Sequence, residues 1–589
     1  MNVPRSEYPR PQFVRDEWRC LNGEWQFEID PGDSGLQRGL RERPLSGRIV
    51  VPFCPESELS GVGNTDFLNA VWYRREVTIP SAWRGRHVRL HFGAVDYDAT
   101  VWVDGVEVGR HRGGFTPFTC DLGGIVETGQ TAVIVVRARD DHRRPKPLGK
   151  QSQQYANYGC HYTRTTGIWQ TVWMEPVPPS HLLRPRITPD LGRGCFHLVQ
   201  PVRGPRWGLS LHVRLRDEGG EVCAARTPAD ADFSPTVELA IPPGRRRLWS
   251  PADPHLYDLD IELRDADDGV VDRASSYAGL RSVAVEGRAV KLNGRAVFQR
   301  LVLDQGYYPD GMLTAPTDEA LRRDIELSRA AGFNGARLHQ KVFEERFLYH
   351  ADRLGYLVWG EFADWGCRAV DLSGHHDLRP APTYITQWLE VLARDYSHPC
   401  IVGWCALNES HEPITDRVTT LDDVTRGLFL AAKAMDATRP VLDASGYSHR
   451  VATTDIYDCH DYDQDPTTFA ERHAGLRRGE PFYNGPTDRP WSVPCRGQPF
   501  FVSEFGGIWW NPAAAGQADR ARSWGYGSRP ATIEEFYERF EGLCNVLLND
   551  PAMFGYCYTQ LTDVFQEQNG VYFFDRRPKF DLARLRRIQ

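Results

Sequence analysis

Two mostly apolar stretches of the sequence each end at a glutamate, and these carry its clearest chemistry. Residues 401–407 lead to Asn408 and Glu409, and residues 500–503 lead to Glu504. An apolar run of this length is typical of a buried strand that delivers its last side chains to a pocket. Two carboxylates facing one pocket are what hydrolysis of a glycosidic bond requires, because one protonates the leaving oxygen while the other attacks the anomeric carbon or activates water. We therefore take Glu409 and Glu504 as the candidate catalytic pair.

Polar neighbours of this pair suggest supporting roles. Asn408 could hydrogen-bond a sugar hydroxyl beside the anomeric centre, and Tyr462 could donate to the carboxylate that acts as nucleophile. Arg337 could hold that same carboxylate in place, with His339 and His460 as further candidates. Each of these side chains could instead be a satisfied loop residue or part of a structural ion pair. Both interpretations stay open from the residues alone.

Aromatic residues surround both glutamates in the sequence and could supply the apolar walls of a sugar site. They are Trp404, Phe501, Phe505, Trp509 and Trp510. The alternative is that such rings belong to the core. The distance between the carboxyl groups, which separates retention at about 5–5.5 Å from inversion at about 6.5–9.5 Å, is not encoded in the sequence.

The last 300 or so residues predict the element order of a (β/α)₈ barrel. Expected strands are 297–303, 333–338, 356–361, 401–408, 440–445, 455–460, 500–504 and 553–558, and expected helices are 317–331, 343–354, 383–396, 421–437 and 532–548. Chemistry in this fold lies at the carboxyl ends of the strands. The candidates there are Asp304, Gln305, Arg337, His339, Glu361, Asn408, Glu409, His460, Tyr462, Glu504, Tyr558 and Gln560, with Trp509 just beyond.

Before the barrel, short alternating segments predict two antiparallel β-sandwiches. The pair Asp104-Gly105 between alternating runs predicts a type I′ hairpin within the first of them. We expect a first domain at 1–178, an immunoglobulin-like domain of about a hundred residues at 179–284, and the barrel at 285–589.

Composition excludes several other classes. The 589 residues carry 70 basic and 78 acidic side chains, a net charge of −8 without long single-sign blocks, so a nucleic acid is not an expected partner. No run reaches the roughly 18 apolar residues of a membrane span, and the first residues have no apolar export core. Thirteen scattered cysteines without a CxxC pair fit reduced thiols, so we expect a cytoplasmic protein.

No cofactor or metal is expected. The signatures GxGxxG after a strand, GxxxxGK[ST] and GxSxG are missing from the sequence. A metal held by His339, Glu361 and His460 is conceivable, but HExxH or comparable spacing is missing. A glycoside or oligosaccharide is the expected partner, and a homo-oligomer stays open.

Many stretches, in order, resemble glycoside hydrolase family 2, the family of β-galactosidases, β-glucuronidases and β-mannosidases. They are Leu21-Asn22-Gly23-Glu24-Trp25-Gln26-Phe27, Val51-Pro52-Phe53, Thr166-Gly167-Ile168-Trp169-Gln170, Gly279-Leu280-Arg281, Asn293-Gly294, Asn408-Glu409, Ser503-Glu504-Phe505-Gly506, Asn569-Gly570 and Asp575-Arg576-Arg577-Pro578-Lys579. The resemblance implies a sugar-binding jelly roll, an immunoglobulin-like middle and a catalytic barrel. It also implies a retaining mechanism, with a glycosyl ester on Glu504 and Glu409 acting as acid and then base.

Departures from the family bear on specificity. β-Glucuronidases carry an Asn-x-Lys whose lysine meets the uronate, whereas here Asn569 is followed by Gly570 and Val571. The family's Glu-x-His magnesium site after the third strand is replaced by Asp364-Trp365-Gly366, and Arg337-Leu338-His339 is one residue short of Arg-x-Ser-His. We expect an exo-acting, metal-independent retaining glycosidase, β-galactosidase-like first, with β-glucuronidase and galactofuranosidase or arabinosidase specificity as alternatives. The alternative to an enzyme is a carbohydrate-binding protein that keeps the fold but has no catalytic activity.

Overall fold

In the computed structural model, which describes residues 3–141, 145–365, 381, 383–486, 488–512 and 523–589, the chain begins with an antiparallel β-sandwich. One sheet runs in the order β3 (Gly47–Val51), β2 (Gly23–Ile29), β4 (Ala70–Thr78), β10 (Thr131–Arg139), β7 (Asp98–Val103) and β8 (Val106–Arg112). The other runs β1 (Arg19–Cys20), β12 (Val172–Val177), β5 (His87–Phe92) and β9 (Phe118–Asp121), and a small pair joins β6 (Val95–Asp96) to β11 (Gly167–Ile168). The hairpin at Asp104 and Gly105 is confirmed, since both have positive φ between β7 and β8.

A second sandwich follows. Its sheets are β14 (Arg186–Asp190), β15 (Cys195–Val199) and β19 (Thr236–Ala240), and β18 (Gly220–Pro228), β17 (Ser210–Asp217), β20 (Tyr257–Arg264) and β21 (Val270–Ala278). A short pair joins β13 (His181–Leu182), which precedes β14, to β16 (Val202–Arg203), which follows β15 in the chain. The strands β22 (Val283–Glu286), β23 (Ala289–Leu292) and β24 (Arg295–Ala296) lead into the barrel. Leu211, Val213 and Leu215 alternate with more exposed residues along β17, which is why this strand forms half of a sandwich core. The domain limits themselves stay predictions.

The predicted eight parallel strands are confirmed in the barrel. Their order is β29 (Val441–Leu442), β28 (Ile401–Cys405), β27 (Leu357–Glu361), β26 (Gly335–Leu338), β25 (Gln299–Asp304), β32 (Met553–Thr559), β31 (Phe500–Gly506) and β30 (Tyr457–Asp461). Nearly every residue of these strands is buried, as expected for a sheet covered on both faces. Glu504 therefore lies within β31, and Glu409 lies four residues beyond β28.

The helices surround the strands. The expected ones are α1 (Asp318–Ala330), α2 (Glu345–Leu354), α3 (Thr383–Asp395), α4 (Thr420–Met435) and α6 (Ile533–Leu548). The short helices α5 (Pro466–His473) and α7 (Leu582–Ile588) were not predicted. No helix in the described part of the chain is both long and apolar enough to span a bilayer.

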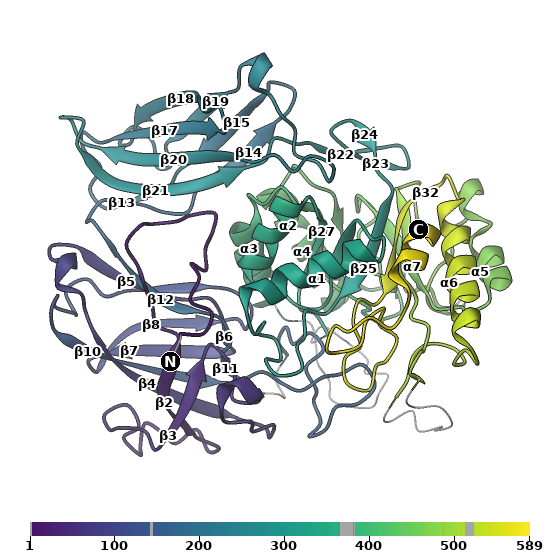
Figure 1. The fold of residues 1–589 in the computed structure, drawn as a ribbon, viewed down its shortest axis with the longest axis horizontal. Helices are drawn as coiled ribbons and strands as arrows, with labels where there is room; N and C mark the ends of the chain where they lie inside the picture. The colour runs from purple at the N-terminus through teal and green to yellow at the C-terminus, as the bar shows by residue number, and fades with distance from the viewer. Residues whose placement is uncertain (1–2, 142–144, 366–380, 382, 487, 513–522) are drawn as a thin grey trace.

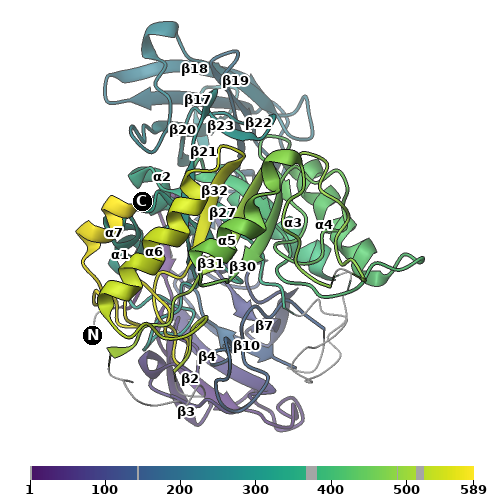
Figure 2. The ribbon, with the colours of Figure 1, turned by 90° about the vertical axis from the view of Figure 1, so that its right-hand side faces the viewer.

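Both sandwiches lie beside the barrel, the first below and the second above in the view of Figure 1, and the turned view in Figure 2 agrees. The fully buried Arg281, which ends the second sandwich, connects it to the barrel. Its guanidinium donates to the carbonyls of Pro399 and Ile401, each at 3.1 Å. Ile401 is the first residue of β28, so this contact helps to hold the strand that leads to Glu409.

Candidate active site

The two candidate glutamates meet at one histidine. His460, in β30, has its Nδ1 2.8 Å from Glu409 Oε1 and 3.4 Å from Glu504 Oε2. One carboxylate oxygen of Glu409, one carboxylate oxygen of Glu504 and one ring nitrogen of His460 all lie within 4.8 Å of one another. Carboxylates that start 95 positions apart in the chain therefore share one place at the carboxyl ends of β28 and β31.

Both oxygens of Glu504 accept hydrogen bonds from fixed donors. Arg337 Nη1 donates to Oε1 at 2.7 Å, and the hydroxyl of Tyr462 donates to Oε2 at 2.5 Å. The ring of Tyr462 stacks on Tyr526, with centroids 3.4 Å apart and planes at 4°. This arrangement fixes the orientation of the Glu504 carboxylate and places a positive charge against it.

Arg337 is the centre of a buried cluster. Besides Glu504, it contacts Glu361 Oε2 at 2.5 Å and donates through Nη2 to Asn408 Oδ1 at 2.5 Å. The Nδ2 of Asn408 is buried and has no hydrogen-bond partner among the described residues. A buried donor without a partner is costly, so this amide group is suited to an incoming hydroxyl.

Glu361 and His339 are close together beneath Glu504. Glu361 Oε1 accepts from the backbone amide of Gln340 at 2.9 Å and lies 3.1 Å from His339 Nδ1. Burial raises the pKa of Glu361 to about 7, with Arg337 acting against the rise. Burial, together with the charges of Lys150 and Arg337, lowers the pKa of His339 well below its ordinary value. His339 is therefore neutral at neutral pH.

The carboxylate neighbours of His460 favour its protonated form. Burial alone would lower its pKa, but Glu504 and Glu409 raise the pKa of His460 above the ordinary value. Its Nε2 lies 2.9 Å from Ser445 Oγ, and its backbone amide donates to Asn484 Oδ1 at 2.8 Å. Both ring nitrogens of His460 therefore have polar partners, and its backbone is held by Asn484.

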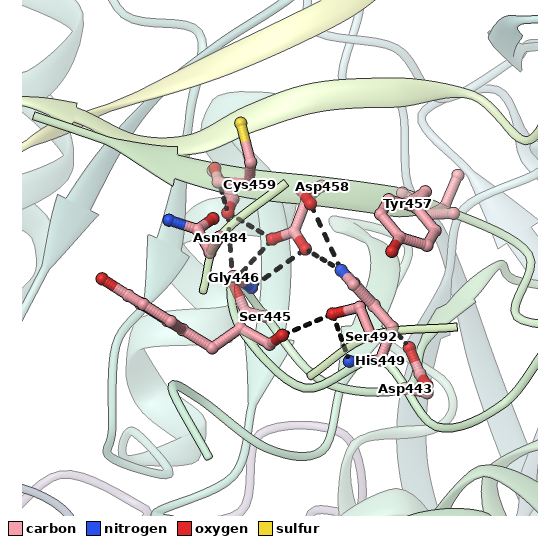
Figure 3. A network of polar contacts seen from close by, with 12 residues as sticks. Asp443, Ser445, Gly446, His449, Tyr457, Asp458, Cys459, Asn484 and Ser492 are labelled. Carbon is pink, nitrogen blue, oxygen red and sulfur yellow. Dashed lines mark hydrogen bonds and ion pairs between the residues drawn. The ribbon is translucent and has the colours of Figure 1, made fainter. Parts of the chain in front are cut away.

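Figure 3 shows a polar network that connects the loop after β29 with β30. These strands, β29 and β30, are the two end strands of the barrel sheet. Ser445 Oγ donates to Asp458 Oδ2 at 2.7 Å, and His449 lies between Asp458, at 3.1 Å, and Asp443, at 2.9 Å. Although burial opposes the charged form, Asp443 and Asp458 raise the pKa of His449 to about 10. This buried ion cluster positions Ser445 and, through it, His460.

The remaining candidates divide into two groups. Gln305, Gln560 and Asn569 form an amide chain, with Gln305 Nε2 donating to Gln560 at 2.7 Å and Gln560 Nε2 to Asn569 at 2.8 Å. Asp304 accepts from the amide of Gly306 at 2.8 Å, and burial raises its pKa to about 7. None of these side chains contacts Glu409 or Glu504 in the described part of the chain.

Tyr558 points away from the catalytic pair. Its ring packs against Phe540 of α6 at 5.0 Å and against Phe505, so its predicted role as a substrate contact is not supported. Trp509 follows β31 and is nearly buried, with its Nε1 donating to Ser523 Oγ at 3.0 Å. Its predicted contact with substrate stays a prediction.

The predicted aromatic walls need a correction. Trp404 is fully buried between strand and helices, with Nε1 donating to Asp436 at 2.8 Å, and Phe505 is likewise on the outer side of the barrel. Phe501 packs on Trp359 inside the barrel, with ring centroids 5.4 Å apart. Alternate residues of a strand face opposite sides of a sheet, so a ring near a catalytic residue in sequence need not face the same space.

Sequence reasoning missed several residues of this region. Tyr526 stacks on Tyr462, and Tyr162 of the first sandwich donates to Glu567 Oε2 at 2.6 Å. Lys150, also from the first sandwich, lies near His339 and both catalytic candidates. These residues follow no strand of the barrel, so the strand-end rule could not find them.

Within the described residues, three groups of side chains have the composition and proximity to hold a metal. One is the set Glu409, His460 and Glu504 itself; the others are Asp190-Cys195-His197 and Asp352-His398-Cys400. In the first group the Glu504 oxygens already accept from Arg337 and Tyr462, and the neighbouring carboxylates favour the protonated form of His460, so this donor set is a poor fit for a cation. We therefore expect the carboxylates of Glu409 and Glu504 to act on a substrate directly.

The chain is similar to several proteins of known name or structure. The chain is 26% identical over 473 residues to a protein named Beta-glucuronidase from Paenibacillus borealis, covering 74% of each, and 27% identical over 468 residues to one from Canis lupus familiaris, covering 74% of this chain and 69% of the other. Among solved structures, a Ruminococcus gnavus β-glucuronidase bound to an N1-substituted uronic isofagomine aligns over 100% of both chains, with a TM-score of 0.78 and 21% identity. The same enzyme with D-glucuronic acid gives a TM-score of 0.77 at 21% identity.

Family profiles match all three parts of the chain. The sugar binding domain of glycosyl hydrolases family 2 matches residues 18–142, the family's middle domain matches residues 200–281, and its TIM barrel domain matches residues 311–481. The three matched segments follow the first sandwich, the second sandwich and the barrel in order. The chain is therefore a glycosidase and belongs to glycoside hydrolase family 2.

Proposed function

We propose that this enzyme removes terminal β-glucuronic acid residues from glycosides by a double displacement with retention of configuration. The observation that carries the mechanism is the shared contact of Glu409 and Glu504 with His460, which brings both carboxylates to one point. Oxygens within 4.8 Å of each other support the short spacing of retaining enzymes, because inversion needs about 6.5–9.5 Å between the carboxyl groups for a water.

The environments of the two glutamates support different roles. Glu504 has a side chain only 5% exposed, and Arg337 and Tyr462 donate hydrogen bonds to its two oxygens, which supports the role of nucleophile. The side chain of Glu409 is 18% exposed, which leaves it able to meet a leaving group and a water. It therefore acts first as general acid and then as general base.

The reaction is balanced by these two groups. Glu504 attacks the anomeric carbon and forms an ester, while Glu409 gives its proton to the departing glycosidic oxygen. A water then loses a proton to Glu409 and attacks the same carbon, which releases the sugar and restores both carboxyl groups. The unpartnered Nδ2 of Asn408 supports a hydrogen bond to a sugar hydroxyl during both steps.

The glycon assignment differs from the expectation that placed β-galactosidase first. The relatives that cover about three quarters of the chain are named Beta-glucuronidase, which supports the alternative. A neutral glycon remains the second candidate, because the amides of Gln305, Gln560 and Asn569 favour hydroxyl groups over charge. Glu567, beside Asn569 at 3.4 Å, also repels a second carboxylate.

A panel of aryl β-glycosides tests the glycon. We expect the β-D-glucuronide to have the highest kcat/KM, with the galactoside, glucoside, mannoside, arabinoside and galactofuranoside below it. NMR of the first product should show the β-anomer of the free sugar. A preference for a neutral glycoside would reject the glucuronide proposal, and a first-formed α-anomer would reject retention.

Two variants test the assignment of roles. Glu504→Ala should abolish turnover, whereas Glu409→Ala should lower it by about 10²–10⁴-fold with a leaving group that needs protonation. Azide added to Glu409→Ala should yield the β-glycosyl azide from the ester, and added to Glu504→Ala the α-azide by direct displacement. Azides of the opposite configurations would exchange the two roles, and unchanged activity in both variants would place catalysis elsewhere.

A further inference from the structure

A segment of the first sandwich brings a lysine to the barrel. The backbone amide of Gly149 donates to the carbonyl of Asp364 at 3.1 Å, and Asp364 Oδ2 accepts from the amide of Asn408 at 2.7 Å. A Cβ on Gly149 would lie 2.1 Å from the carbonyl oxygen of Gln340, so the segment lies directly on the barrel backbone. One aspartate therefore positions both Lys150 and the strand end that leads to the catalytic acid.

Aromatic rings and a small cavity surround the ammonium group of Lys150. Its Nζ lies 5.3 Å from the ring centroid of Trp365 and 5.8 Å from that of Tyr162, within the range of cation–π contacts. Lys150 also lines a cavity of about 20 Å³ together with Gln305 and His339. These contacts place a half-buried cation next to the residues that support the nucleophile.

Apart from the rings of Trp365 and Tyr162, Lys150 has no partner for its ammonium group among the described residues. Among the residues that the structure describes, Lys150 forms neither an ion pair nor a side-chain hydrogen bond. The other two cations near the site are engaged, Arg337 by Glu361 and Glu504, and Lys341 by two backbone carbonyls. Lys150 alone among these three keeps its donors for a ligand.

The charge of Lys150 is stable at neutral pH. Burial favours the neutral amine, but the carboxylates of Glu567, Glu504 and Glu409 raise the pKa of Lys150 above its ordinary value. The same charge contributes, after burial, to the low pKa of His339. The ammonium group thus interacts electrostatically with Glu409, with Glu504 and with Glu567, which lies beside Asn569.

We propose that Lys150 is the specificity residue that receives the carboxylate of a uronic acid glycon. The inference rests on the proposed function, because it needs an acidic sugar bound between Glu409, Glu504 and Glu567. A fourth carboxylate among these three is strongly repelled unless a cation neutralises it, and Lys150 is the cation with free donors. The selectivity for uronides then depends on the first sandwich as well as on the barrel.

The test compares two inhibitors that differ only in a carboxylate. Isofagomine carries a hydroxymethyl group where uronic isofagomine carries the carboxylate, and both are measured against Lys150→Met in the full-length enzyme. We expect the inhibition constant of uronic isofagomine to rise about 10- to 100-fold, and that of isofagomine to change less than about threefold. Lys150→Arg should keep most of the affinity for the uronic inhibitor.

A matched control is Lys433→Met, which removes an ammonium group paired with Asp455 at 2.8 Å on the outside of the barrel. It should leave both constants unchanged. Unchanged isofagomine binding also shows that Lys150→Met is folded.

The possible failures are distinguishable. If Lys150→Met weakens both inhibitors equally, or neither, while the wild type hydrolyses glucuronides, the lysine does not read the glycon and the inference is overturned while the proposed function stands. If the wild type itself hydrolyses neutral glycosides but not glucuronides, the proposed glycon and the inference are rejected together.

Discussion

At the scale of single residues, two hydrogen-bond donors fix the orientation of the Glu504 carboxylate. Arg337 neutralises its charge from one side, and Tyr462 donates to its other oxygen at 2.5 Å. Hydrogen bonds to a charged acceptor are among the stronger ones, so these two contacts decide where the nucleophile points. The stack of Tyr526 on Tyr462 in turn keeps the phenol in place.

Replacing Tyr462 with Phe should separate orientation from binding. The ring and its stack remain, but Glu504 loses one donor, so we expect kcat to fall about 10- to 100-fold with little change in KM. Steady-state kinetics on the aryl β-glucuronide measure both constants. Tyr483→Phe, a half-exposed tyrosine whose hydroxyl accepts from the amide of Cys495, is the control and should behave as the wild type. A rise in KM with kcat intact would make Tyr462 a binding residue instead.

At the scale of elements, the sequence was most informative where a strand ends. The rule that polar side chains follow apolar runs selected Glu409, Glu504, Arg337 and His460, and the structure brings these four side chains together at the ends of parallel strands. The same rule predicts that a residue lies at the end of a strand, but it does not predict on which face of the sheet its side chain lies. Tyr558, which the rule also selected, packs outward against α6.

Residues contributed by other elements escaped prediction for a different reason. Lys150 and Tyr162 come from irregular segments of the first sandwich, where no periodicity fixes the direction of a side chain. Their position depends on how two domains pack, which local patterns do not encode. Tyr526 likewise lies outside the barrel strands, between β31 and α6 in the chain.

Gly403 shows how β27 and β28 fit together. A Cβ there would lie 2.7 Å from the ring of the fully buried Trp359, just as a Cβ on Gly360 would lie 2.6 Å from Trp404. Each strand thus uses a glycine to receive a tryptophan of the other. Close packing of this kind leaves no room for an added methyl group without displacing β28, the strand that leads to Glu409.

Gly403→Ala should therefore destabilise the enzyme by about 1–3 kcal/mol and lower kcat as well. Urea unfolding followed by tryptophan fluorescence measures the first effect, and steady-state kinetics the second. Gly244→Ala is the control, because a Cβ there meets nothing within 4 Å. Equal stability of the two variants would show that the strands can separate without cost.

At the scale of the whole molecule, the domains act as one unit. Tyr162 of the first sandwich donates to Glu567 of the barrel, and Trp524 and Gln566 each donate to the carbonyl of Gly159 at 2.7 Å. Arg281 makes the corresponding connection for the second sandwich. The first sandwich, which lies below and beside the barrel in Figure 1, thus contacts the barrel close to the candidate active site.

Buried carboxyl groups spread over this unit predict how its stability depends on pH. Burial raises the pKa of Glu56, Glu361 and Asp304 to about 7 each. Because the protonated form is favoured in the folded state, their contribution is fully present below about pH 4 and is lost as the pH rises through about 7. Asp436 and Asp458, whose pKa values are lowered to about 2 despite burial, lose their contribution only below about pH 4.

The unfolding temperature should consequently fall between pH 5 and pH 8, by several degrees in calorimetry. Glu56 allows a clean test because it lies in the first sandwich, where its Oε2 accepts from the amide of Thr166 at 3.1 Å and its Oε1 is buried without a partner. Glu56→Gln keeps the shape and removes the titration, so its Tm should fall less steeply over this range than that of the wild type. Parallel Tm curves for the two proteins would show that Glu56 titrates alike in the folded and unfolded states, and the pH dependence would then have to come from other groups.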